Sequence, residues 1–212
     1  MSRSRSAATS TRGRELVTAG RQLLEDEGPE ALTMRRLADR VGIRAPSLYK
    51  HIPDKAALEA AIIVTGLEEA AAAFEAAVDG ADHRRAEGAG KGKDEGGPSS
   101  GDRAGAVAGD ATAPCPPGAL PALAAAYRRF ALEHPHLYRL MTNGPLPREH
   151  LPTGLEARTA APLLRVAGSQ ARARAVWAFA HGMVMLELDH RFPPDADLDA
   201  AWQAGIAAFQ ED

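Results

Sequence analysis

Residues 33–55 read TMRRLADRVGIRAPSLYKHIPDK, and this stretch has the features of two short helices joined by a tight turn. Thr33 suits the N-cap of the first helix, because its hydroxyl can accept a hydrogen bond from an amide of the first turn. Gly42 can adopt the positive φ that a tight helix–helix turn requires. Pro46 is tolerated in the first turn of the second helix. Pro53 ends that helix, since the residue before a proline is biased away from the helical region.

The apolar residues of this stretch are arranged as in a helix-turn-helix. Leu37, Ala38 and Val41 face inward at helical spacing, and Ala38 is small where the two helices cross. Ile43 and Leu48 can anchor the turn and the second helix. The outward face then carries hydrogen-bond donors and one small apolar residue suited to a thymine methyl group: Arg44, Ala45, Ser47, Tyr49, Lys50 and His51. The pattern predicts a second helix that lies in the major groove of DNA, with Thr33 and Lys55 placed for phosphates.

The remaining segments predict an all-α protein of about nine helices, because none shows the alternation of a half-buried strand. Further helices are expected at about residues 11–27, with Thr11 as N-cap, and at about 54–78, 120–134, 155–167, 170–189 and 197–209. Residues 137–141 are expected to form a short apolar turn, and Pro162 to break or kink its helix.

Two segments have the composition of disorder. Residues 1–10 form a basic arm without periodic apolar residues. Residues 79–118 hold 10 of the 20 glycines, and Val107 is their only large aliphatic residue. Such a segment cannot bury enough apolar surface to offset its ordering entropy. We therefore expect the arm at 1–10, a DNA-binding domain at 11–57, and a C-terminal domain at 58–212 that contains a disordered insert at about 79–118.

Charge is distributed unevenly along the chain. Residues 1–60 hold 11 Lys/Arg and 8 Asp/Glu, a net charge of +3. Because the whole chain has a net charge of −3, residues 61–212 carry −6. A mildly basic N-terminal segment followed by an acidic remainder suggests that the N-terminal segment binds an anion.

Neither a secretory signal nor a transmembrane helix is expected from the sequence. No apolar run follows the N-terminal arginines, and the apolar run at residues 175–186 is shorter than the ~20 residues that span a bilayer. The lone Cys115 excludes an internal disulfide, and a reducing, cytoplasmic location fits.

Enzyme and metal-site hypotheses find little support in the residues. His134 and His136 flank Pro135 without a carboxylate cluster to complete a metal site. Gly-rich phosphate loops and nucleophile motifs are absent from the sequence. Glu187, Asp189 and His190 are better explained as the solvated end of a helix than as catalytic groups. We therefore expect no cofactor, no metal and no enzymatic activity, with a helical hydrolase or metal protein as the alternative from that class.

Residues 11–62 closely resemble the DNA-binding domain of TetR-family transcriptional regulators, whose three-helix unit ends in Leu-Tyr-x-His, here Leu48 to His51. The resemblance implies base contacts from Arg44, Ala45, Pro46 and Lys50, and phosphate contacts from Ser47, Tyr49, His51 and Lys55. Arg35 falls at a position that contacts a base or a phosphate. Met34 departs from the pattern, since some members place a hydroxyl residue there. Tyr49 can also pack partly into the core, and His51 can equally be a capping or packing residue.

The C-terminal half resembles the TetR-type WHG domain through Trp177-x3-His181-Gly182 and the upstream segment at 134–141. Trp177 and His181 are four residues apart, so they share a helix face. We expect them to line an effector pocket, or to form a packed core pair. The predicted ligand-binding residues are Trp177, His181, Tyr127, Phe130, Tyr138 and Met141. The helix around them is apolar on all sides and needs a cover, which predicts a dimer interface of Gly182, Met183, Leu186, Trp202 and Ile206.

Together these patterns predict a homodimeric DNA-binding regulator. It would repress transcription from a pseudo-palindromic operator and respond to a small apolar or aromatic effector. The alternative within the same fold is a constitutive or protein-regulated DNA binder without an effector.

Overall fold

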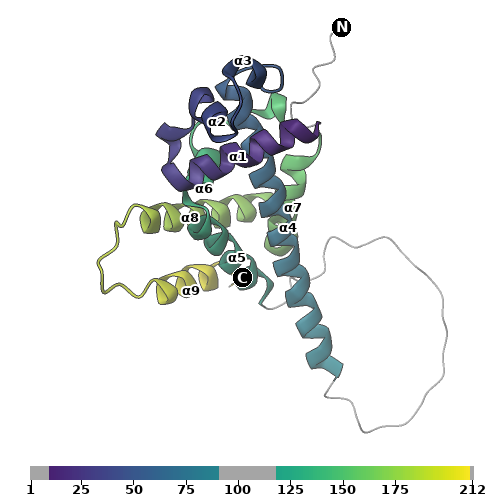
Figure 1. The fold of residues 1–212 in the computed structure, drawn as a ribbon. Helices are drawn as coiled ribbons and strands as arrows, with labels where there is room; N and C mark the ends of the chain where they lie inside the picture. Colours follow the sequence, from purple (N-terminus) through teal and green to yellow (C-terminus); the bar gives the residue numbers. More distant parts are fainter. Residues whose placement is uncertain (1–9, 91–117, 211–212) are drawn as a thin grey trace, which may run out of the picture. The chain divides into compact units, whose positions relative to one another are not determined.

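The structure is a computed structural model that describes residues 10–90 and 118–210, and these residues form nine α-helices and no β-strand (Figure 1). The predicted all-α architecture is therefore confirmed for the described residues. The helices are α1 (Thr11–Glu27), α2 (Met34–Arg40), α3 (Ala45–Leu48), α4 (Lys55–Gly90), α5 (Ala119–Glu133), α6 (Pro135–Thr142), α7 (Leu155–Ala167), α8 (Gln170–Leu188) and α9 (Leu198–Ala208), with short 3₁₀ turns at Pro29–Ala31 and Arg148–His150. None of the described helices is long and apolar enough to cross a membrane.

Polar side chains cap most of the predicted helix starts. The Thr33 hydroxyl accepts a hydrogen bond from the Arg36 amide at 3.2 Å, and the Asp54 carboxylate accepts one from the Ala57 amide at 2.8 Å. Each such cap satisfies an amide that would otherwise lack a partner, and is worth about 1 kcal/mol. The first helix begins one residue earlier than predicted. Ser10 caps it through the Gly13 amide, and Thr11 is the first helical residue.

Three elements differ from the sequence prediction. The helix expected to end near Val78 continues to Gly90, so residues 79–90 are helical rather than part of an insert. Val78 and Ala81 are buried there, and this packing outweighs the ~1 kcal/mol that a helical Gly80 costs. Residues 137–141 belong to the helix α6, which Pro135 opens at a position where proline needs no partner. The α3 helix ends at Leu48, and residues 49–51 continue as a turn.

The predicted basic arm and most of the predicted insert fall beyond what the structure covers. Residues 1–9 and 91–117, including Cys115, lie outside the described residues. Pro162 lies inside α7 without ending it, and α7 has the bounds that the sequence predicts.

The chain divides into two compact units. The first comprises residues 1–72 and 128–159, and the second comprises residues 73–127 and 160–212. The predicted boundary at residues 57–58 lies inside α4, and α6 packs with α1 in the first unit. The core of the first unit includes the fully buried Leu16 and Leu24 of α1. A Cβ atom on Gly20 of α1 would lie 3.0 Å from Leu58 Cδ1, so α1 and α4 approach closely at this glycine.

In the second unit α8 packs beside α9 (Figure 1). The buried stripe of α8 is made of small and β-branched residues: Ala173, Val176, Ala180 and Val184. The Phe179 ring lies edge-on to Trp202 at 5.7 Å and tilted against Phe209 at 5.9 Å. The Trp202 indole N–H donates to Glu187. A Cβ atom on Gly205 would overlap the Phe179 ring, so this glycine lets α9 approach α8.

Replacement of Gly205 by alanine should destabilise the protein by about 1–3 kcal/mol, because the added methyl group forces the Phe179 ring out of its place between Trp202 and Phe209. The gain in helix propensity, about 1 kcal/mol, offsets only part of this loss. Urea denaturation measures the change. The same substitution in a Phe179→Leu background should cost clearly less, and equal costs in both backgrounds would contradict a clash with the ring.

Candidate nucleic-acid interface and C-terminal face

The turn between α2 and α3 holds the two helices at a fixed angle. Gly42 has a φ of +67°, as the turn prediction requires. The Ile43 amide then donates to the Ala38 carbonyl at 3.0 Å. Leu37, Ala38 and Leu48 are buried beneath the turn, which confirms their predicted inward orientation, whereas Val41 is half-buried. A helix as short as α3 cannot hold its own conformation, so these contacts determine its direction.

The predicted DNA-binding residues lie on the accessible side of this unit. Seven of them are exposed: Arg35, Arg44, Pro46, Ser47, Tyr49, Lys50 and Lys55. Thr33, Ala45 and His51 are half-buried. Tyr49 is 51% exposed, so core packing explains little of its placement. The half-buried His51 can both pack against the unit and contact a phosphate.

The cations of this surface differ in their partners. No ion pair between described residues involves Arg35, Arg44 or Lys50. Lys55 pairs with Glu59 at 3.4 Å, one helical turn away. An exposed pair of this kind is worth only about 0.3–0.5 kcal/mol, so Lys55 can exchange Glu59 for a phosphate.

A polar network connects α1 to α4 and α6 within the first unit. His134 Nε2 lies 3.3 Å from Glu69 of α4, and His134 Nδ1 lies 3.9 Å from Glu25 of α1. The Leu137 amide, in the first turn of α6, donates to the same Glu25 carboxylate at 3.2 Å. Arg21 of α1 pairs with Glu69. No sequence motif predicts this network, because its members are far apart along the chain.

His134 and His136 do not form a metal site in the structure. No group of three or more His, Cys, Asp or Glu residues in the described part of the chain could hold a metal ion. His134 faces carboxylates, and the His136 ring lies beside the backbone of Gly28 at the end of α1.

On α8, Trp177 and His181 stack with their ring centroids 6.0 Å apart, as their spacing predicts. Trp177 is nevertheless 51% exposed, so the single chain does not pack it as a core residue. Burial lowers the pKa of His181 below the ordinary 6.5, because desolvation disfavours the imidazolium form. The exposed indole and the imidazole stacked on it form an aromatic surface with one polar group.

The other predicted ligand-binding residues lie in several environments. Tyr127, in the second unit with Trp177 and His181, stacks on Phe74 with the ring centroids 5.7 Å apart. The remaining three belong to the first unit, where Phe130 packs edge-on against His134, Tyr138 is buried, and Met141 is half-buried.

The predicted dimer-interface residues also separate into two groups. Gly182 has open space where a side chain would begin, Leu186 is 42% exposed, and Met183 is half-buried. Trp202 and Ile206 are only 6% and 4% exposed, and the Trp202 contacts with Phe179 and Glu187 lie within one chain. Their burial assigns these two residues to the chain's own core, and the open surface is on α8.

Two family models match the chain, over residues 16–62 ("Bacterial regulatory proteins, tetR family") and residues 120–209 ("Tetracyclin repressor-like, C-terminal domain"). The chain belongs to the TetR family of transcriptional regulators. It is thus a DNA-binding regulator rather than an enzyme. The first match contains every predicted DNA-contacting residue, and the second contains Trp177, His181 and Gly182.

Individual proteins resemble the chain over different lengths. The tetracycline repressor protein class C of Escherichia coli is 46% identical over 43 residues, which are 20% of each chain. A solved protein of unknown function from Rhodococcus sp. RHA1 is 23% identical, with a TM-score of 0.63 over 93% of this chain and 92% of that one. A TetR variant from Acinetobacter baumannii AYE, solved with minocycline, is 22% identical, with a TM-score of 0.55 over 92% of both chains. At these identities the solved structures show that the TetR regulator has their fold.

The lowered pKa of His181 predicts that this TetR regulator loses stability in acid. The unfolded chain binds a proton at His181 more readily than the folded chain, so the contribution of His181 is complete above pH 6.5 and is lost as the pH falls through the lower folded-state pKa. Urea denaturation at pH 8 and pH 5.5 should show a smaller acid loss for His181→Gln than for the unsubstituted chain. His190→Gln, at the exposed end of α8, is the control, and equal acid losses in all three proteins would refute the prediction.

Proposed function

We propose that this TetR regulator is a ligand-responsive repressor that binds a pseudo-palindromic operator as a homodimer. The exposed donor surface of α3 and its flanking turns, held on a rigid helix-turn-helix, carries the proposal. Arg44, Ala45 and Lys50 would contact base edges, and Ser47, Tyr49 and Lys55 would contact phosphates. Arg35, Pro46 and Thr33 would complete the surface at the start of each helix, and His51 would add a phosphate contact. Such a protein would act in the cytoplasm, where it reaches DNA.

The open face of α8 supports a homodimer. Gly182 and Leu186, four residues apart, share an accessible face, and the buried stripe of the helix lies on the opposite side. Trp177 is exposed at the edge of the buried stripe. An exposed apolar face of this kind is covered most simply by the same face of a second chain, which gives a two-fold interface. A two-fold dimer presents two copies of α3 to half-sites about 34–36 Å apart, and therefore requires a palindromic operator.

An effector of small apolar or aromatic character is proposed for the C-terminal half. The TetR variant from Acinetobacter baumannii AYE was solved in complex with minocycline. In this chain the stacked Trp177 and His181 offer an aromatic surface with one polar group. The effector would release DNA only if it binds one conformer more tightly than the other.

One observation favours the alternative of a regulator without an effector. Phe130 and Tyr138, both predicted to line the pocket, are only 6% and 3% exposed. They act as core residues in the single chain, and a filled core leaves less room for a ligand. Thermal melts with a panel of fused-ring and aryl compounds separate the two hypotheses, because a ligand that binds the native state raises Tm with its concentration.

Two lysines test the proposed DNA surface. Lys50→Ala should change base preference at one operator position, at a cost of about 1–3 kcal/mol, because a base-edge hydrogen bond is lost. Lys55→Ala should weaken binding to all sequences alike and reduce the slope of log K against log salt by about 0.9, as for one lost phosphate contact. Fluorescence anisotropy with operator and scrambled duplexes measures both. Unchanged affinity in both variants would contradict the docking of α3 in the groove.

A bulky residue on the open face of α8 tests the dimer. Gly182→Leu should leave the fold of the single chain intact, since nothing lies within 4 Å of the position, but should yield monomers or aggregates by light scattering. Leu164→Ala, which alters an exposed apolar residue of α7, should keep the dimer. A stable dimer of the Gly182→Leu protein would place the interface elsewhere.

A further inference from the structure

The charges at the end of α1 and the start of α2 oppose the dipoles of their own helices. The last turn of α1 carries Asp26 and Glu27 and no basic residue. The first turn of α2 carries Arg35 and Arg36 and no acidic residue. Anions are unfavourable at a helix C-terminus and cations at an N-terminus, so each helix is locally destabilised. Because the charges at both of these neighbouring helix termini oppose the dipole preference, a compensating interaction between the two termini is expected.

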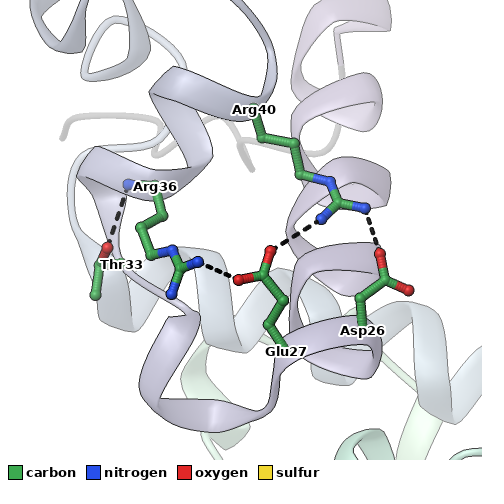
Figure 2. Close-up of polar contacts among 5 residues, drawn as sticks. All are labelled: Asp26, Glu27, Thr33, Arg36 and Arg40. Carbon is green, nitrogen blue, oxygen red and sulfur yellow. Dashed lines mark hydrogen bonds and ion pairs between the residues drawn. The ribbon is translucent and has the colours of Figure 1, made fainter.

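The structure shows that compensation directly. Arg36 pairs with Glu27, and Arg40 pairs with both Asp26 and Glu27, the latter at 3.5 Å (Figure 2). Arg36 and Arg40 are one helical turn apart, so both extend from the same face of α2. We call these four residues the α1–α2 clamp.

The three arginines of α2 differ in their ion-pair partners. Arg36 and Arg40 face the acidic end of α1, whereas Arg35 is exposed and makes no ion pair with another described residue. Two of the cations nearest to the recognition unit are therefore neutralised within the protein. Among the three arginines of α2, Arg35 alone makes no ion pair with another described residue and can meet an external anion.

Burial alone does not determine how α2 is rotated on α1. The short helix α2 buries Leu37 and Ala38, and apolar contact is nondirectional. Hydrogen-bonded arginine–carboxylate pairs are directional. Because the turn at Gly42 joins α3 rigidly to α2, any error in the rotation of α2 is transmitted to the recognition residues.

We propose that the α1–α2 clamp sets the orientation of the helix-turn-helix on α1, so that Arg36 and Arg40 are positioning residues that contribute to operator specificity without contacting phosphate. The inference rests on the proposed function, since it concerns the same DNA surface. It differs from a purely stabilising role, because loss of the clamp should reduce discrimination between sequences in protein that is still folded.

The test uses the full chain with two duplexes of equal length. One is the operator that the unsubstituted protein selects from random-sequence DNA, and the other is its scrambled sequence. In Asp26→Asn/Glu27→Gln, operator affinity should fall by about three- to tenfold, as expected for the loss of surface ion pairs of ordinary strength. Affinity for the scrambled duplex should stay constant or rise, because two negative charges are removed. The ratio of the two affinities is the readout, and thermal melts establish that the protein is folded.

Each of three other results would contradict the proposed positioning role of the clamp. If both affinities rise together and their salt dependence steepens, the freed arginines are phosphate contacts that the acids had occupied. If Tm falls while the affinity ratio is unchanged, the pairs only stabilise the fold. If the unsubstituted protein selects no sequence at all, the proposed function fails together with the inference.

Two further variants sharpen the result. Glu27→Arg/Arg36→Glu exchanges the two charges of one ion pair. It should recover much of the ratio of operator affinity to scrambled-duplex affinity that either single substitution loses. The same variant tests the proposal if Asp26→Asn/Glu27→Gln fails to fold. Glu15→Gln breaks the exposed Arg12–Glu15 pair, which spans 2.8 Å near the other end of α1. This control removes one negative charge from the same helix and should leave the ratio unchanged.

Discussion

The close approach of α1 and α4 at Gly20 is the contact on which the first unit depends. A Cβ atom at this position would lie 3.0 Å from Leu58 Cδ1, so the absence of a side chain at residue 20 lets the two helices pack this closely without displacing Leu58. Leu16 and Leu24 of α1 are fully buried around the same contact. At interior packing density such a seam transmits displacements instead of absorbing them. The helix that carries the helix-turn-helix and the helix that leads into the second unit are therefore joined along their apolar faces.

Around this seam α1 makes polar connections to α2, α4 and α6, and the connection to α4 is the Arg21–Glu69 pair. The last turn of α1 holds α2 through Asp26 and Glu27, and Glu25 accepts a hydrogen bond from the start of α6. His134 places an imidazole between Glu25 and Glu69, which are on different helices. The α2 helix and the start of α6 thus both contact one helix of 17 residues.

Sequence reasoning succeeded where the cause of a feature is local. Thr33, Gly42 and Pro46 occupy the cap, the positive-φ turn and the helix start that their chemistry favours. It failed where burial decided the outcome. Val78 and Ala81 extend α4 beyond the point at which glycine and charge suggest an end. The helix at 135–142 was mistaken for a turn, because a short apolar run beside a proline has no periodicity of its own to read.

By itself the sequence determined the all-α fold, the helix-turn-helix and the resemblance to the TetR family, because helix periods, caps and turn residues act over a few positions. It also predicted the hydrogen-bond donors of α3 and of the residues that flank it. The tertiary structure alone decided which of the charged residues pair with each other, as Arg36 and Arg40 do with α1, and which aromatic residues stay exposed, as Trp177 does. Ion pairs and solvent exposure depend on residues brought together from distant segments, and no local pattern encodes those distances.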